Sequence, residues 1–376
     1  MAALMLTRQG CQARQQRLLQ ILQRNRWDLF LTGNYRSVYY FSGALSTADV
    51  PALFALWSDG HTLAVTAAGS ESFTDEAIPL EIYSIQRTIT HPFHDAARLL
   101  RHGLAKHAQS VSRCGIERAT TSPLAEECVE QCWPKAQILD ATDAVLELRK
   151  RKEQDEIGEI RESLRLIKAA YRAARETIAP GLTEIDVYNA MYAAAVREAG
   201  TSVTFAGDFA CGKRAIKAGG PPTTRVLEAG DLYILDLFPA PALYFGDTCR
   251  TFAVGAPSDL QLRAWEIVRK AVRLGEQAVR PGVPARDVYA VVKDYLDAQE
   301  ISRKSFWHHA GHGIGHHGHE APRIVPGTDD IFEVGDVITL EPGIYSEELR
   351  GGIRLEDNYV VRENGLENLF DFPMEL

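Results

Sequence analysis

The distribution of apolar and polar positions divides the chain near residue 150. Before that point, short apolar runs alternate with stretches of helical spacing, which is typical of an α/β domain. Residues 12–23 are predicted to form a helix and residues 27–32 a strand. Two further apolar runs, 52–57 and 62–66, lie on either side of an Asp-Gly turn, as the strands of a hairpin do.

An amphipathic helix is predicted to open the second part of the chain. Its apolar residues recur with the i, i+3, i+4 spacing that places them on one helical face. These residues are Ile157, Ile160, Leu164, Ile167 and Tyr171. A Pro-Gly pair ends this pattern, and Thr183 can cap the next helix with Asp186 three positions later.

A segment of the second part is repeated further along the chain. Residues 180–188 return in altered form as residues 281–289, and both copies begin with Pro-Gly and share Asp-Val-Tyr at the same offset. Each copy follows a long helical pattern, opens another helix and precedes predicted strands that carry two acidic residues. We interpret the repeat as a duplicated helix-and-strand unit, whose two halves would bring four acids together.

The first two of these acids belong to one predicted hairpin. Asp236 interrupts the apolar run 232–238, and two prolines then force a turn. The strand 246–252 returns with Asp247 near its start. Such a hairpin can set the two aspartates beside each other.

The other two acids lie at the ends of predicted strands in the second half. Glu341 follows a short apolar strand and precedes a Pro-Gly break. A strand over 352–361 would point alternate side chains to one face, namely Arg354, Glu356 and Asn358.

Histidines crowd the segment between the two pairs of acids. Six of the eleven histidines lie between His308 and His319. This run alone is equally compatible with a solvated loop, and each acid alone with an ordinary strand-end residue. Several buried carboxylates are costly unless they are neutralised, which favours metal binding for the set. Two divalent ions about 3.5–4 Å apart would offset four carboxylates and activate a shared water.

Composition narrows the function classes. The apolar content is 45% and the formal charge is −9, which is typical of a globular protein and argues against a nucleic-acid surface. Apolar runs are too short for a membrane span, and we expect a cytoplasmic protein. The six cysteines lack the paired spacing of a zinc site, although Cys128 and Cys132 would share a helical face.

The order of these motifs resembles that of the pita-bread metallopeptidases. Asp236 and Asp247 precede Gly-His-Gly-Ile-Gly around His312, followed by Glu-Pro-Gly at Glu341 and Gly-Ile-Arg-Leu-Glu-Asp around Glu356. Within these enzymes the chain is similar to the Xaa-Pro branch, which includes aminopeptidase P and prolidase. The resemblance covers nearly the whole chain, weakly before residue 150 and strongly after it.

This resemblance implies an α+β fold in two domains. Residues 1–150 would form a smaller α/β domain like the N-terminal domain of creatinase and prolidase. Residues 151–376 would form the catalytic pita-bread domain with duplicated helix-strand halves. Relatives commonly pair, so the resemblance also implies a homodimer.

The resemblance also assigns the metal ligands. Asp236 would hold one divalent ion, His312 and Glu341 the other, and Asp247 and Glu356 would bridge the two. Glu341 would in addition accept a proton from the attacking water. A ligand set with one nitrogen and otherwise oxygen suits manganese, cobalt, iron or zinc.

Further residues would act on the substrate by the same resemblance. His308 and His319 match histidines that position the scissile carbonyl and stabilise the developing charge. Arg354 matches an arginine that orients a ligand or contacts substrate. Three histidines have no counterpart and are interpreted as solvated or supporting residues: His309, His316 and His317.

The chain departs from this pattern at two places. Xaa-Pro peptidases usually carry a further histidine at the position of Gly219, and no histidine lies between His107 and His308. We therefore expect a more open pocket wall there. Residues 238–240, Phe-Pro-Ala, replace a small glycine-containing turn and are similar to the equivalent segment of creatinase, a metal-free hydrolase.

The sequence thus predicts a binuclear metal-dependent hydrolase. It would release the N-terminal residue of an Xaa-Pro peptide or dipeptide by attack of a metal-bridging hydroxide. An alternative is a metal-dependent hydrolase of a small non-peptide amide, like the substrates of creatinase or ectoine hydrolase. A remote alternative is an inactive binding scaffold, which the complete ligand set disfavours.

Overall fold

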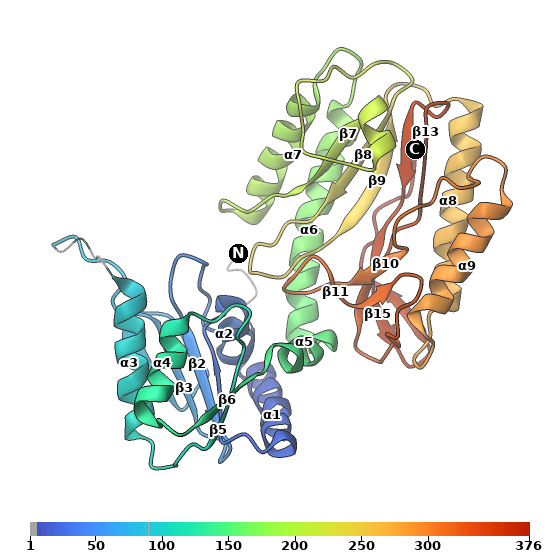
Figure 1. Ribbon diagram of the computed structural model, residues 1–376. Helices are drawn as coiled ribbons and strands as arrows, with labels where there is room; N and C mark the ends of the chain where they lie inside the picture. Colours follow the sequence, from blue (N-terminus) through green and yellow to red (C-terminus); the bar gives the residue numbers. More distant parts are fainter. Residues whose placement is uncertain (1–5, 87, 89–90) are drawn as a thin grey trace. The chain divides into compact units, whose positions relative to one another are not determined.

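The computed structural model describes residues 6–86, 88 and 91–376. The chain forms two compact units that divide between Arg149 and Lys150, and each is described by itself (Figure 1). The helices up to this boundary are α1 (Arg8–Asn25), α2 (Tyr35–Ser42), α3 (Pro92–Lys106), α4 (Pro123–Cys132) and α5 (Thr142–Lys150). The strands of the first unit are β1 (Leu29–Thr32), β2 (Leu53–Trp57), β3 (Thr62–Ala67), β4 (Glu76–Leu80), β5 (Arg113–Ile116) and β6 (Gln137–Asp140).

The N-terminal unit is a sheet covered by helices on both faces. Its strands follow the order β4-β3-β2-β1-β5-β6, with β2 antiparallel to both β1 and β3. Alternate side chains of β1 enter different cores: Leu29 and Leu31 pack with Leu100 of α3, whereas Phe30 packs with Leu22 of α1. The predicted helix 12–23 and the predicted strands of this part are confirmed.

The second unit contains two helix pairs and three sheets. Its α-helices are α6 (Gln154–Thr177), α7 (Glu184–Ala199), α8 (Asp259–Ala278) and α9 (Ala285–Ala298), and a 3₁₀ helix, η1, covers Gly212–Lys217. Its strands are β7 (Gly207–Cys211), β8 (Leu232–Leu237), β9 (Thr248–Ala253), β10 (Gly311–Gly313), β11 (Glu320–Ile324), β12 (Val337–Leu340), β13 (Gly343–Ser346), β14 (Gly351–Arg354), β15 (Asp357–Arg362) and β16 (Gly365–Asn368). The sheets have the orders β7-β8-β9, β11-β10-β12-β15-β16 and β13-β14.

The amphipathic pattern of α6 determines which face it buries. All five apolar residues predicted to share one face are at most 1% exposed: Ile157, Ile160, Leu164, Ile167 and Tyr171. Thr183 caps α7 and forms the predicted reciprocal capping contacts with Asp186. Among the described residues, no helix combines the length and the apolar character that a membrane span requires.

The two copies of the repeated segment have equivalent structures. Gly181 donates a backbone hydrogen bond to Leu227 at 3.0 Å, and Gly282 donates the equivalent bond to Phe332 at 2.8 Å. Both glycines have positive φ angles, 93° and 86°, which a residue with a side chain rarely adopts. In each copy the residue two positions further forms an isolated β-bridge. The helix pairs α6–α7 and α8–α9 therefore begin equivalent halves, as the duplication predicts.

A short backbone contact joins the halves. Glu356 donates to the carbonyl of Cys249 at 3.1 Å and accepts from its N–H at 3.4 Å. The continuous strand predicted over 352–361 is wrong, because β14 ends at Arg354 and β15 begins at Asp357. The break arises because β14 pairs with β13, whereas β15 pairs with β12 and β16.

Candidate metal centre

The two aspartates lie together because β8 and β9 form an antiparallel pair. Asp236 is opposite Cys249 in the register, and Leu237 is opposite Thr248. Asp247 directly precedes β9 and therefore lies next to Asp236, as the predicted hairpin requires. The two residues are only 7% and 6% exposed, so both carboxylates lie within the protein.

The other half contributes a histidine and two glutamates. His312 is in the middle of β10, Glu341 directly follows β12, and Glu356 lies between β14 and β15. Because β10 pairs with β12 and β12 with β15, neighbouring strands bring these three side chains together. The backbone pair between Glu356 and Cys249 then brings them to the aspartates.

The side chains from the two halves form one buried cluster. His312 Nε2 lies 3.1 Å from Glu341 Oε1 and 3.8 Å from Asp247 Oδ2. One donor atom from each of Asp247, His312 and Glu356 lies within 4.8 Å of the other two. His312 Nδ1 is 3.0 Å from the carbonyl oxygen of Gly313, which can only accept a hydrogen bond. Nδ1 therefore carries the proton, and Nε2 can offer its lone pair to a metal.

The carboxylates of the cluster are crowded and incompletely paired. Burial, and then the charges of neighbouring carboxylates, raise the pKa of Asp247 and of Glu356 well above the usual range. Burial also raises the pKa of Asp236. Asp236 Oδ1 and Glu356 Oε2 are buried without a hydrogen-bond partner among the described residues. These buried carboxylate oxygens repel one another and lie beside the unprotonated Nε2 of His312. Such a donor set fits divalent metal ions, which would neutralise the carboxylates.

Glu341 differs from the other acids because histidines contact it. Burial alone would raise the pKa of Glu341, but the imidazoles of His309 and His312 beside its carboxylate hold this pKa well below its usual value. His309 Nδ1 lies 3.1 Å from Glu341 Oε1, and Thr339 donates to the same oxygen at 3.2 Å. Of the two interpretations of His309, solvated or supporting, this contact favours the supporting one, since His309 is a direct neighbour of Glu341.

Arg354 holds the aspartate side of the cluster. Its Nη2 donates to Asp236 Oδ2 at 2.5 Å and to Asp208 Oδ2 at 3.3 Å. Its Nη1 donates to the Tyr345 hydroxyl at 3.2 Å and to the carbonyl of Ala218 at 2.9 Å. Four acceptors therefore fix the guanidinium, and the guanidinium fixes one oxygen of Asp236.

His308 and His319 both lie beside the cluster, but they differ in burial and in hydrogen bonding. His308 Nδ1 donates to the carbonyl of His309 at 2.7 Å, so its Nε2 accepts from the Tyr345 hydroxyl at 2.8 Å. Burial lowers the pKa of His308 to about 4, which keeps the ring neutral. The ring of His319 lies 3.9 Å from that of His312, centroid to centroid, and His319 is exposed.

Other residues support the cluster. The Asn358 side chain accepts from the backbone N–H of Asp247 at 3.1 Å and donates to its carbonyl at 2.6 Å. The period of two already placed Asn358 on this face, and could have predicted a supporting role. His316 is buried against Tyr244, with ring centroids 4.0 Å apart, and His317 is exposed.

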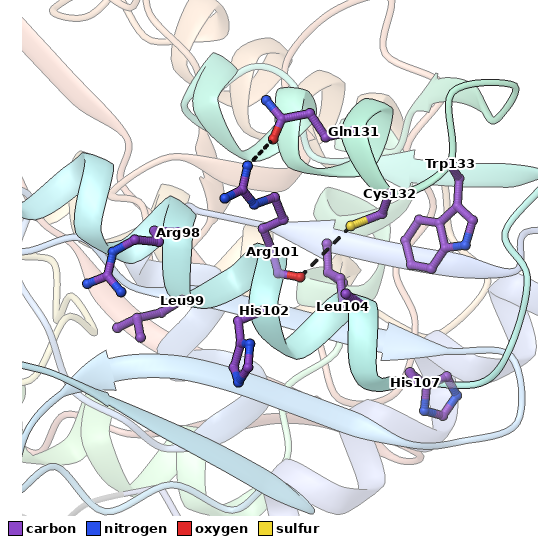
Figure 2. A pocket seen from close by; sticks show the side chains of 10 residues that line it. Arg98, Leu99, Arg101, His102, Leu104, His107, Gln131, Cys132 and Trp133 are labelled. Carbon is purple, nitrogen blue, oxygen red and sulfur yellow. Dashed lines mark hydrogen bonds between the residues drawn. The ribbon is translucent and has the colours of Figure 1, made fainter.

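A second feature, a cavity of about 820 Å³, lies between α3 and α4 of the N-terminal unit. Figure 2 shows Arg101 of α3 donating to Gln131 of α4, at 2.7 Å; His102 and Trp133 also line the cavity. The thiol of Cys132 contacts the backbone carbonyl of Arg101 at 3.9 Å. No acid is among the residues that line this cavity, so it lacks the oxygen donors that the cluster supplies.

Comparison with protein families places the cluster in a known context. The creatinase/prolidase N-terminal domain matches residues 14–151, and metallopeptidase family M24 matches residues 158–363, which is more than half of the chain. The chain belongs to metallopeptidase family M24. Its assignment as a metallopeptidase is thereby confirmed, and all five predicted ligands lie within the matched M24 segment.

Individual relatives define the branch of the M24 family. The chain is 28% identical to a Xaa-Pro dipeptidase of Pyrococcus horikoshii, over 96% of this chain and 97% of the relative. It is 33% identical to an uncharacterized peptidase, YqhT, of Bacillus subtilis, over 64% of this chain and 68% of the relative. The predicted Xaa-Pro branch is confirmed.

Solved structures match the fold over nearly the whole chain. The structure of a Xaa-Pro dipeptidase from Bacillus anthracis has a TM-score of 0.80 and 26% identity, and covers 97% of this chain and 99% of that chain. A prolidase from Pyrococcus horikoshii has a TM-score of 0.79 and 23% identity, with 97% and 99% coverage. The predicted α+β pita-bread fold with a smaller N-terminal α/β part is confirmed.

Proposed function

We propose that this M24 peptidase is a binuclear metal-dependent hydrolase that releases the N-terminal residue from Xaa-Pro peptides. One observation carries the proposal. Asp236, Asp247, His312, Glu341 and Glu356 converge from two duplicated halves into one buried cluster that is short of cations. Relatives named Xaa-Pro dipeptidase, which match nearly the full chain, support the substrate class.

The proposed ligand roles are those that the resemblance to the M24 enzymes implies. Asp236 would hold one divalent ion, His312 and Glu341 the other, and Asp247 and Glu356 would contact both. When bound, the two ions would neutralise the carboxylates, polarise the scissile carbonyl and lower the pKa of a shared water. Manganese, cobalt, iron and zinc all suit one nitrogen and several oxygen ligands.

The proposed roles of the remaining residues follow from their hydrogen bonds. Glu341 would accept a proton at its carboxylate and deliver it to the leaving amine. Both ring nitrogens of His308 already have partners, so His308 would reach substrate only by releasing Tyr345. His319 is exposed beside His312 and would stabilise the developing charge directly. Arg354 would keep Asp236 in its binding orientation.

The proposal also assigns a role to each of the two domains. Residues 151–376 would form the catalytic domain, and residues 1–150 a creatinase/prolidase-like N-terminal domain without catalytic residues. The compact units and the two family matches support this boundary. A hydrolase of small non-peptide amides is the second candidate, because Gly219 replaces the usual substrate-site histidine.

Substrate screening tests this function. The purified, metal-loaded protein is expected to cleave Xaa-Pro dipeptides or longer Xaa-Pro peptides faster than small cyclic or guanidino amides. His319→Ala is expected to lower kcat by about a hundredfold, since one polar contact to the developing charge is lost. His317→Ala, in the same loop, serves as the matched control and should change kcat less than about twofold. Faster cleavage of a small amide would replace this proposal with the second candidate.

The proposal also includes a homodimer, as in relatives of this fold. A stable pair is expected to bury more than about 1,000 Å² in total. Sedimentation equilibrium at micromolar concentration should therefore give twice the chain mass of 41.7 kDa. A mass of one chain under these conditions would refute the dimer.

A further inference from the structure

Asp208 is an additional acid beside the metal centre. It lies on β7 directly opposite Asp236 of β8, so the two side chains point to the same face of the sheet. The Asp236 side chain is 10% exposed, but that of Asp208 is 34% exposed. Asp208 therefore presents a carboxylate to solvent one strand away from a proposed metal ligand.

The Asp208 carboxylate is held in a defined position. Gly220 donates its backbone N–H to Asp208 Oδ1 at 2.8 Å, and Arg354 Nη2 donates to Oδ2 at 3.3 Å. A Cβ placed on Gly219 would overlap this carboxylate and come within 2.7 Å even of the more distant oxygen. The expectation of a more open wall at Gly219 is therefore wrong, because Asp208 fills the space in which a side chain of residue 219 would begin.

Asp208 is not needed to orient the guanidinium of Arg354. The guanidinium already donates to Asp236, to the Tyr345 hydroxyl and to the Ala218 carbonyl, and each of these contacts is shorter than its contact with Asp208. The balance of charges around Arg354 indicates a different role for Asp208. Two divalent ions would offset the four ligand carboxylates, which leaves Asp208 as the counter-charge of Arg354. Arg354 then offers no excess positive charge with which to bind an anionic substrate group.

We propose that Asp208 is a specificity-determining residue that excludes a free carboxylate next to the scissile bond. The favoured substrates would be Xaa-Pro peptides that continue beyond proline or end in an amide, rather than Xaa-Pro dipeptides. This inference rests on the proposed Xaa-Pro hydrolysis. Its physical basis is the repulsion that the partly exposed Asp208 carboxylate would exert on a substrate carboxylate bound beside it, which would weaken dipeptide binding about five- to fiftyfold.

The test compares Ala-Pro with Ala-Pro-amide, which differ in this one charge. The wild-type kcat/KM is expected to favour the amide at least about tenfold, and Asp208→Asn should reduce the ratio about five- to fiftyfold. Gly219→Ala should reduce it too, because the new methyl group must displace the Asp208 carboxylate. Asp329→Asn removes an exposed acid that pairs with Arg286, and should leave the ratio unchanged.

Equilibrium binding of L-proline and L-prolinamide to the metal-loaded proteins gives the same comparison without turnover. An equal slowing of both substrates in Asp208→Asn, with an unchanged binding ratio, would overturn the inference and leave Asp208 as a partner of Arg354. If the wild type hydrolyses neither peptide, the proposed function fails. The binding ratio then still decides the role of Asp208.

Discussion

Asp247→Ala is expected to lower kcat/KM on the best Xaa-Pro substrate by about a thousandfold or more. Metal ions supply several kcal/mol of transition-state stabilisation, and each 1.36 kcal/mol corresponds to tenfold in rate. Asp247 would contact both ions under the proposed assignment, and its Oδ2 lies 3.8 Å from His312 Nε2. Its removal would disturb the shared site rather than one contact. The measurement is steady-state hydrolysis at saturating metal.

The matched control for this prediction is Asp329→Ala, which removes a fully exposed aspartate of the same unit. It should retain wild-type activity and the same melting temperature. Circular dichroism establishes whether Asp247→Ala is folded. A folded Asp247→Ala protein that keeps more than a tenth of the activity would contradict the assignment of Asp247 as a shared ligand.

Removal of metal is expected to lower the melting temperature of the wild type by about 5–10 °C. A ligand at a hundred times its Kd contributes about 2.7 kcal/mol, and a domain of this size shifts about 2–4 °C for each kcal/mol. Without ions, the buried carboxylates of the cluster repel one another, and Glu356 Oε2 has no hydrogen-bond partner among the described residues. The measurement is thermal unfolding before and after exhaustive chelation.

Glu356→Gln is expected to change the melting temperature in opposite directions with and without metal. The substitution removes a repelling charge, so the chelated variant should melt above the chelated wild type. With metal present it should melt below the wild type, because a ligand is missing. Asp329→Asn should show neither effect. If Glu356→Gln lowered the melting temperature equally with and without metal, repulsion among the buried carboxylates would not be the reason why metal removal destabilises the protein.

The sequence predicted those features that depend on local periodicity. The buried face of α6 followed from the spacing of its apolar residues, because helical geometry alone places Ile160 and Leu164 together. The neighbouring positions of Asp236 and Asp247 followed from a hairpin, which is also local. The repeated Pro-Gly segment predicted two equivalent halves, since the positive φ angles of Gly181 and Gly282 impose the same turn on both.

Several features that depend on the exact pairing of distant strands were not predicted. No local pattern distinguishes Asp208 from a surface aspartate, because its place beside Asp236 depends on the register of β7 with β8. The strand break at Glu356 was missed, since it reflects the change of partner from β13 to the β12 sheet. His309 was set aside because its contact with Glu341 requires a loop and a strand end to meet.

Metal content tests the central claim most directly. Mass spectrometric metal analysis of the wild-type protein, equilibrated with manganese and freed of excess ions, is expected to give two ions per chain. Asp247→Ala should bind fewer than one ion per chain under the same conditions, whereas Asp329→Ala should bind two. A wild-type protein that hydrolyses Xaa-Pro peptides with no bound metal, or an Asp247→Ala protein that retains both ions, would contradict the binuclear site.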